Sequence, residues 1–239
     1  MTDREAKRLE KLLYYVLGRR PDEFGLFPVN GLVKLKDLLK ALNEIDGFKN
    51  IKAKQIRDFF AIFKPERLVY LEEEQLLGVR KEFADPHVYK TVFEAHPPPR
   101  LFTPVRPRAW IKVAEEGLAA EKIILTPEED LAARMARRRG ALVIEVDTRK
   151  AMQEGSVFER YLEKIFLSTW IPASALRGPK VDEAFRARYT PKPKEIPQEE
   201  RPAQEIVIPE KAVPFRKLTK GRKKDPAWKR ERRRRHRER

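Results

Sequence analysis

Basic residues are the side chains of this sequence that are best suited to chemistry. Lys and Arg number 53 against 37 Asp and Glu, which gives a formal net charge of +16. Guanidinium groups hold phosphate oxygens through paired, charge-assisted hydrogen bonds and stabilise developing negative charge. Two arginine clusters lie in the first 180 residues: Arg19-Arg20 before Pro21, and Arg137-Arg138-Arg139 before Gly140. Both follow helical patterns, so they also fit the simpler role of complementing a helix dipole.

The excess of positive charge is concentrated near the C-terminal end. Residues 216–239 hold 14 Lys and Arg but only three acids. This composition predicts a disordered basic tail that binds polyanions with a steep dependence on salt. Trp228 lies within the run, where it either stacks on a base or anchors a short helix.

Other residue types exclude several classes of site. The absence of cysteine excludes disulfides, thiolate zinc sites and cysteine nucleophiles. The three histidines, His87, His96 and His236, fall in segments that we expect at the surface or in linkers, and we expect no metal site. The first residues lack an apolar leader, and no run approaches the roughly 18 apolar residues of a membrane span. We therefore expect a cytoplasmic protein without a membrane partner, and the composition leaves the oligomeric state open.

The elements that must position these residues begin with three helices and a hairpin. Apolar residues at three- and four-residue spacing predict helices, and short apolar runs around an acidic turn predict a hairpin. We expect helices over 5–17, 35–42 and 53–63, and strands over 68–71 and 76–79. This order is typical of a winged-helix-like lobe over residues 1–82, with a small α+β packing module as the simpler alternative. We expect Tyr14, Tyr15, Phe59 and Phe60 in its core, with a role as base-stacking platforms as the alternative.

A second folded region is expected after a proline-containing linker at 83–99. Alternating strand and helix patterns predict a compact α/β lobe over 100–178, and hence an α+β protein overall. We expect helices over 110–116 and from an N-cap at Thr126 to Arg139, and strands over 122–125, 141–147 and 165–168. Gly117 and Gly140 suit the two helix ends. Residues 179–215 have the composition of a proline-rich linker.

With the segments in this order, the chain resembles the NAD-dependent RNA 2′-phosphotransferase family over residues 5–178. The resemblance rests on several local patterns in the same order and spacing. They are Leu17-Gly18-Arg19-Arg20-Pro21, Gly25-Leu26, Gly31-Leu32-Val33, Glu116-Gly117-Leu118, Arg137-Arg138-Arg139-Gly140 and Ile171-Pro172. It implies a winged-helix lobe followed by a C-terminal ADP-ribosyltransferase-like α/β lobe.

The resemblance also implies a reaction and its residues. In that reaction an RNA 2′-phosphate attacks the ribose of NAD, nicotinamide leaves, and the ADP-ribose then removes the phosphate. Arg80 and Arg138 match two arginines that contact phosphate in the family, and Arg19 stands in the slot of the family's histidine. The three would face one another across a cleft between the lobes. RNA is the implied partner, and NAD is the implied cofactor if the chain is active.

The sequence departs from the family at the other chemical positions. Gly18 stands where the family has an arginine before the histidine. Phe102-Thr103-Pro104-Val105 replaces a Tyr-His-Gly-Thr loop that binds NAD, and residues 122–126 replace a histidine-containing strand with Lys-Ile-Ile-Leu-Thr. Phe102, Thr103 and Thr126 are therefore only weak candidates for cofactor binding.

Three hypotheses follow. The first is an RNA-binding protein that holds phosphorylated RNA in an arginine-lined cleft and has lost NAD chemistry. The second is an active NAD-dependent RNA 2′-phosphotransferase, and the third is a ribosome- or nucleoid-associated protein whose body carries the tail. The further nucleic-acid-binding candidates are Arg20, Arg137, Lys223, Lys224, Trp228, Arg232, Arg233, Arg234 and Arg235.

Overall fold

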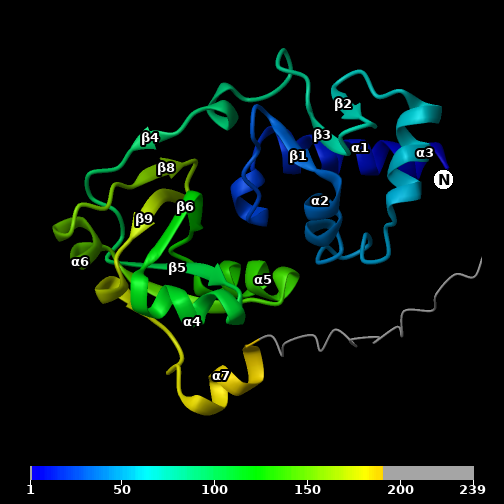
Figure 1. Ribbon diagram of the computed structural model, residues 1–239. Coiled ribbons are helices and arrows are strands. Elements are labelled where there is room, and N and C mark those ends of the chain that lie inside the picture. Colours follow the sequence, from blue (N-terminus) through cyan, green and yellow to red (C-terminus); the bar gives the residue numbers. More distant parts are fainter. Residues whose placement is uncertain (1, 191–239) are drawn as a thin grey trace, which may run out of the picture. The chain divides into compact units, whose positions relative to one another are not determined.

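The computed structural model describes residues 2–190, which all belong to one compact unit (Figure 1). Over these residues the fold is α+β, with seven α-helices and three small antiparallel sheets. The basic tail and residues 191–215 of the expected linker lie outside the described residues. So do Lys223, Lys224, Trp228 and the four arginines at 232–235.

The N-terminal region, residues 2–85, contains the three helices and the hairpin that the sequence predicts. Its elements are α1 (Asp3–Gly18), a 3-10 turn η1 (Pro21–Phe24), β1 (Leu32–Lys34), α2 (Leu35–Leu42), α3 (Ala53–Phe63), β2 (Leu68–Leu71) and β3 (Leu76–Val79). The strand order is β1-β3-β2, with both pairs antiparallel. Strand β1 was not predicted because its three residues are too few to show a periodic pattern, and its pairing with β3 is long-range.

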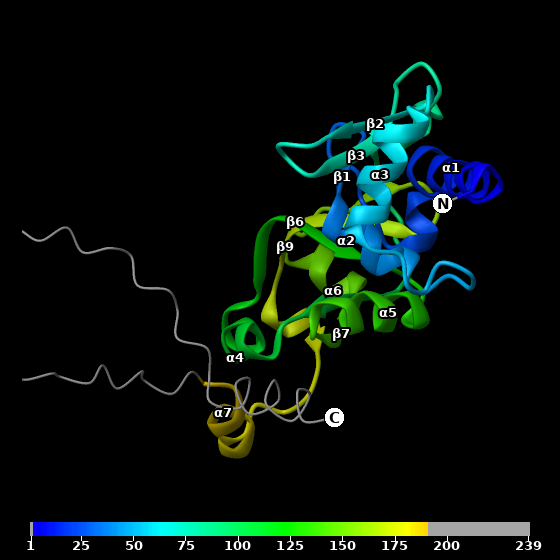
Figure 2. The ribbon, with the colours of Figure 1, turned by 90° about the vertical axis from the view of Figure 1, so that its right-hand side faces the viewer.

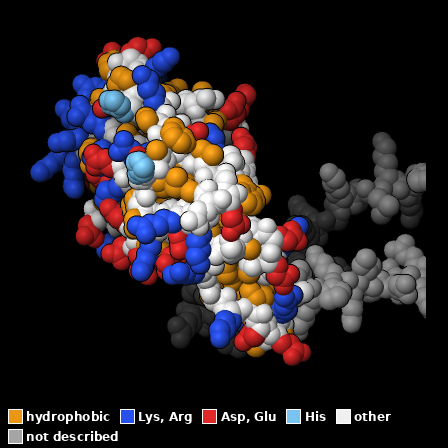
Figure 3. All heavy atoms as spheres, turned by 90° about the vertical axis from the view of Figure 1, so that its left-hand side faces the viewer, with side chains coloured by type: hydrophobic (Ala, Val, Ile, Leu, Met, Phe, Trp, Pro, Cys, Tyr) orange, Lys and Arg blue, Asp and Glu red, His pale blue; other side chains and the backbone are white. Residues whose placement is uncertain are grey.

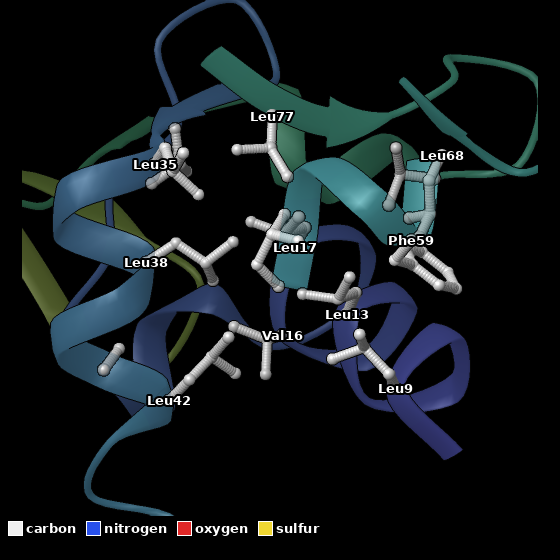
Figure 4. Close-up of a cluster of buried hydrophobic side chains, with 14 of the residues drawn as sticks. Leu9, Leu13, Val16, Leu17, Leu35, Leu38, Leu42, Phe59, Leu68 and Leu77 are labelled. Carbon is white, nitrogen blue, oxygen red and sulfur yellow. The ribbon is translucent and has the colours of Figure 1, made fainter. Parts of the chain in front are cut away.

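One hydrophobic core joins these elements (Figure 4). Leu9, Leu13 and Val16 of α1 meet leucines of α2 and of the sheet, and all three are almost fully buried. Phe59 is buried as expected, whereas the prediction for Tyr15 was wrong: its side chain is 39% exposed. Tyr15 lies on the face of α1 that points away from the core.

The C-terminal region, residues 86–190, has two sheets. Its elements are η2 (Pro86–Tyr89), β4 (Val92–Phe93), β5 (Arg100–Val105), α4 (Pro107–Glu116), β6 (Leu118–Leu125), α5 (Glu129–Arg139), β7 (Leu142–Asp147), α6 (Thr148–Gln153), β8 (Glu159–Tyr161), β9 (Ile165–Ile171), η3 (Ala173–Ala175), β10 (Leu176–Arg177) and α7 (Glu183–Tyr189). The strand orders are β10-β7-β5 and β4-β8-β9-β6. The sheets meet where Phe102 and Thr126 pair through both backbone hydrogen bonds.

Two expected linkers are folded within the described residues. The segment 83–99 contains η2 and β4, and β4 pairs with β8. At the start of the segment 179–215, Asp182 caps α7 by accepting a hydrogen bond from the backbone N–H of Phe185. Trp110 of α4 anchors the chain just before that helix, since its indole N–H donates to the carbonyl of Pro179 at 2.9 Å. The proline-containing segment 83–99 thus supplies an edge strand, and long-range contacts decide that it packs against the folded region.

The predicted start of α5 was also wrong. The helix begins at Glu129 with Glu128 as its N-cap, two residues after the expected cap at Thr126. Thr126 instead belongs to the bridge with Phe102, and its hydroxyl accepts a hydrogen bond from the backbone N–H of Glu128. The predicted C-terminal stop is confirmed, because Gly140 adopts the left-handed conformation with φ 59°.

Candidate nucleic-acid interface

A groove on the exposed side of α1 brings basic and aromatic side chains together. We call it the α1 groove. It has a volume of about 710 Å³ and is lined by Lys7, Glu10, Lys11, Tyr14, Tyr15, Arg19, Glu66 and Arg67. The α1 residues at 7, 11, 14 and 15 share one helix face because they are spaced by three and four positions. Arg67 is added from the opposite wall, just before β2.

Two guanidinium groups in the α1 groove pack on one aromatic ring. The Cζ atoms of Arg19 and Arg67 lie 5.7 Å and 5.4 Å from the ring centroid of Tyr14, within the range of a cation–π interaction. The ring is held in place because the Tyr14 hydroxyl donates to the carbonyl of Phe83 at 2.7 Å. Among residues 2–190, no carboxylate lies within 4.0 Å of either guanidinium. Their hydrogen-bond donors are thus positioned for an external anion.

Tyr15 supplies a partly exposed aromatic surface to the same groove. Its ring meets Phe24 edge to face, with centroids 6.3 Å apart. Its hydroxyl donates to Oε2 of Glu23 at 2.8 Å, and this hydrogen bond raises the pKa of the phenol. The side chain is therefore oriented and neutral near pH 7, which suits stacking against a base.

Arg80 lies beside the α1 groove. Its backbone N–H donates to the carbonyl of Arg67 at 2.9 Å, and its side chain is exposed. Gly18, which precedes Arg19, packs directly on Val79, the residue before Arg80. Two of the three predicted phosphate contacts, Arg19 and Arg80, therefore come from neighbouring segments.

The third predicted contact, Arg138, has a different role in the structure. Its Nε donates to Oε1 of Glu44 at 2.7 Å, its Nη2 to Oε2 of Glu44, and its Nη1 to the carbonyl of Phe24. The side chain is only 8% exposed. Because its donors already have partners inside the protein, Arg138 does not join Arg19 and Arg80 in an open arginine-lined cleft.

Arg20 is also occupied by internal partners. It contacts Asp22 at 3.3 Å and Glu163 at 2.7 Å, and Glu23 at 3.5 Å. Burial disfavours its charge, but the hydrogen bonds and charges of Glu163 and Asp22 outweigh burial and raise its pKa. The fully buried Asp22 also accepts the backbone N–H groups of Glu163 and Lys164, each at 3.2 Å. Arg20 and Asp22 therefore join the N-terminal region to the β8–β9 turn, contrary to the prediction that Arg20 binds nucleic acid.

The predicted nucleic-acid-binding residue Arg137 has an exposed side chain that an external ligand could reach. It lies exposed in the last turn of α5, and within the described part of the chain it has no ion-pair partner. Its neighbour Arg138 turns inward to Glu44, so the three arginines of this cluster do not act together.

The weak candidates for cofactor binding are used inside the C-terminal region. The buried Thr103 hydroxyl donates to the carbonyl of Ile124 at 2.9 Å, and Thr126 is fully buried. Phe102 exchanges both backbone hydrogen bonds with Thr126, at 2.8 Å and 3.0 Å. At the place where the resemblance put NAD, the backbone of Phe102 and Thr126 is thus already hydrogen-bonded, the side chains of Thr103 and Thr126 are buried, and the side chain of Phe102 is half-buried.

Gly18 explains one departure from the family. A Cβ atom at this position would lie 2.7 Å from Cγ2 of Val79, which is closer than real Cβ atoms approach. Helix α1 therefore packs on β3 too closely for the family's arginine, unless Val79 moves.

Sequence reasoning missed three cations of the α1 groove, Lys7, Lys11 and Arg67. The signal for the two lysines was present, because they continue the helix face of Tyr14 and Tyr15. Arg67 had no such signal, since its position beside α1 depends on the tertiary packing of β2. A second groove of about 690 Å³ lies against α1 and α3, but one of its two cations, Lys49, is paired with Asp46 at 2.7 Å.

Within residues 2–190, no three His, Asp or Glu side chains lie close enough to hold a metal ion, and no helix is long and apolar enough to cross a membrane. A scan against protein-family models matches none of them to this chain, and a search of curated proteins finds no similar sequence.

Proposed function

We propose that this chain is an RNA-binding protein whose folded part holds the phosphate backbone in the α1 groove. The observation that carries the proposal is the pair of guanidinium groups, Arg19 and Arg67, which pack on Tyr14 without an acidic partner in the described residues. Two like charges at one ring repel each other, and a bound phosphate would reduce this repulsion, since Glu10 and Glu66 line the groove but pair with neither guanidinium. Lys7 and Lys11 extend the positive surface along α1.

A single-stranded ligand suits this groove best. Tyr15 offers one partly exposed ring beside the cations, and base–aromatic stacking requires an unpaired base. The acidic turn between β2 and β3, with exposed Glu72, Glu73 and Glu74, would repel the phosphates of a duplex that approached the hairpin tip. RNA rather than DNA is proposed because of the resemblance to RNA 2′-phosphotransferases.

The same resemblance supports a finer description of the fold. The order α1-β1-α2-α3-β2-β3 and the sheet order β1-β3-β2 match those of a winged helix. This order supports our interpretation of the N-terminal region as winged-helix-like, and the interpretation of the C-terminal region as ADP-ribosyltransferase-like is supported by the resemblance alone.

Loss of NAD chemistry is part of the proposal. It is supported by the internal bonding of Thr103 and Thr126, by the ion pair of Arg138, and by the close packing at Gly18. An active enzyme would need accessible donors for phosphate and NAD at these positions, whereas the side chains of Thr103 and Arg138 donate to partners within the protein and Thr126 is fully buried.

The test compares two double variants of the full chain with a short single-stranded RNA. Arg19→Gln with Arg67→Gln removes two charges from the groove, and Lys54→Gln with Arg57→Gln removes two exposed charges from α3 as a matched control. Each lost charge-assisted contact is worth on the order of 1.5–3 kcal/mol, so the groove variant, which loses two, should bind roughly a hundredfold more weakly or worse, measured by fluorescence anisotropy. Equal weakening of both variants would reject the groove as the binding site. Thermal unfolding of both variants checks that they remain folded.

A further inference from the structure

The edge strand β4 has the features of an unprotected pairing surface. It is the outer strand of the sheet β4-β8-β9-β6, and residues 90–93 are all exposed. Val92 and Phe93 are 58% and 65% exposed, with no proline or charge within the strand. Figure 3 faces the side on which β4 lies in Figure 1, and hydrophobic side chains surface there among charged ones. Such edges are templates for pairing with another strand.

The backbone of β4 also presents its free groups outward in a defined pattern. Val92 pairs with Arg160 and Phe93 with Glu159, and the backbone N–H of Glu94 donates to the carbonyl of Phe158 at 2.9 Å. Antiparallel ladders alternate bonded and non-bonded pairs, so Val92 and Glu94 face β8. Thr91 and Phe93 therefore direct their N–H and C=O groups away from the sheet.

The sequence around β4 is complementary to itself in an antiparallel arrangement. When two copies of Lys90-Thr91-Val92-Phe93-Glu94 are paired about Val92, Thr91 lies opposite Phe93 and Lys90 lies opposite Glu94. In this register, the outward N–H and C=O groups of Thr91 in one copy form backbone hydrogen bonds with those of Phe93 in the other copy. The charges match as well, because each Lys90 meets the carboxylate of the other copy.

We infer that this chain forms a two-fold symmetric dimer through β4, with Val92 on the axis. The two four-stranded sheets become one continuous sheet, joined by four backbone hydrogen bonds and two Lys90–Glu94 pairs. Glu94 is already oriented by Arg160, which lies 3.1 Å from its Oε2. The contact is isologous, so it closes after two copies rather than growing into a fibre. This inference is independent of the proposed RNA binding.

The absence of cysteine in the whole chain allows a direct test. On the axis, two residues 92 would form a non-bonded pair with Cα atoms about 4.5 Å apart, which permits a disulfide. Val92→Cys in the full chain should therefore give a disulfide-linked dimer under mild oxidation. Val157→Cys is the control, because Val157 is exposed to a similar extent, 56%, but lies off the proposed axis. Equal rates of cross-linking for the two variants would overturn the inference.

Sedimentation of the full chain supplies an independent measurement. Wild type should show a concentration-dependent dimer, and Phe93→Pro should be monomeric because proline removes an outward N–H without touching the bonds to β8. Lys90→Glu should weaken the dimer at low salt and less so at high salt, since it places two carboxylates opposite each other. Circular dichroism should report an unchanged fold for both variants. A wild type that stays monomeric at all concentrations, or a dimer that survives Phe93→Pro, would contradict pairing through β4.

Discussion

Arg138 of α5 and Glu44, which follows α2, form a two-point ion pair between the C-terminal and N-terminal regions. Lys40 strengthens the same contact, because its ammonium donates to the carbonyl of Arg138 at 2.6 Å. Figure 2 shows α5 next to α2. Arg138, which the resemblance would assign to phosphate, thus joins the two regions in the structure.

Removing Glu44 should destabilise the protein. Glu44→Ala leaves the guanidinium of Arg138 largely buried without its carboxylate, and we expect a loss of about 2 kcal/mol, below the cost for fully buried pairs because Glu44 keeps some solvent contact. Urea unfolding measures the change. The control is Glu116→Ala, which breaks the exposed Lys112–Glu116 pair on α4 and should cost less than about 1 kcal/mol. Equal losses would show that the Glu44 pair contributes no more than a surface contact.

Asp22 should control the β8–β9 turn. Asp22→Ala removes the acceptor of the backbone N–H groups of Glu163 and Lys164 and leaves them without a partner. We expect hydrogen exchange at these two amides to accelerate more than exchange at the β6–β9 pairing. Unchanged protection at residues 163 and 164 would mean that the turn is held by other contacts.

Stability should fall at alkaline pH through Tyr161. Burial raises the pKa of its phenol above the ordinary value, and the hydroxyl donates to the carbonyl of Val88 at 3.2 Å. The unfolded chain releases this proton near pH 10 while the folded chain keeps it, so the free energy of unfolding decreases by up to about 1.4 kcal/mol per pH unit above about pH 10. Tyr161→Phe should show a smaller decrease between neutral and alkaline pH in urea titrations. Parallel pH profiles for the two proteins would contradict this assignment.

Nicotinamide release should be negligible when the protein is mixed with NAD and a 2′-phosphorylated oligonucleotide. The physical reason is that the polar side chains of Thr103, Thr126 and Arg138 are engaged in hydrogen bonds within the protein. In addition, a side chain at position 18 would collide with Val79, so no further cation fits there. Chromatography of the reaction mixture measures the products. Multiple turnovers to an ADP-ribose cyclic phosphate, abolished by Arg80→Ala, would establish an active enzyme instead.

The sequence predicted features that depend on neighbouring residues well, and features that depend on contacts between distant residues poorly. The leucine spacing of α1 and the stop at Gly140 depend on neighbouring residues, and both are confirmed. By contrast, β1 and β4 exist through pairing with distant strands, and neither was predicted. The site residues divide in the same way. The basic pair Arg19-Arg20 was visible, but only the fold decides that Arg19 faces a groove while Arg20 faces Asp22 and Glu163.

The most direct test of the central claim locates the RNA on the folded part of the chain. A short single-stranded RNA containing 4-thiouridine is cross-linked by ultraviolet light to the full chain, and the linked peptides are identified by mass spectrometry. Binding in the α1 groove predicts a linked tryptic peptide over residues 12–19, which contains Tyr14 and Tyr15. The Arg19→Gln, Arg67→Gln variant lacks the cleavage site at residue 19, so its corresponding tryptic peptide covers residues 12–34, and cross-links to Tyr14 and Tyr15 within that peptide should be lost. Cross-links confined to residues 216–239 or to α3 would contradict the claim that the α1 groove binds RNA.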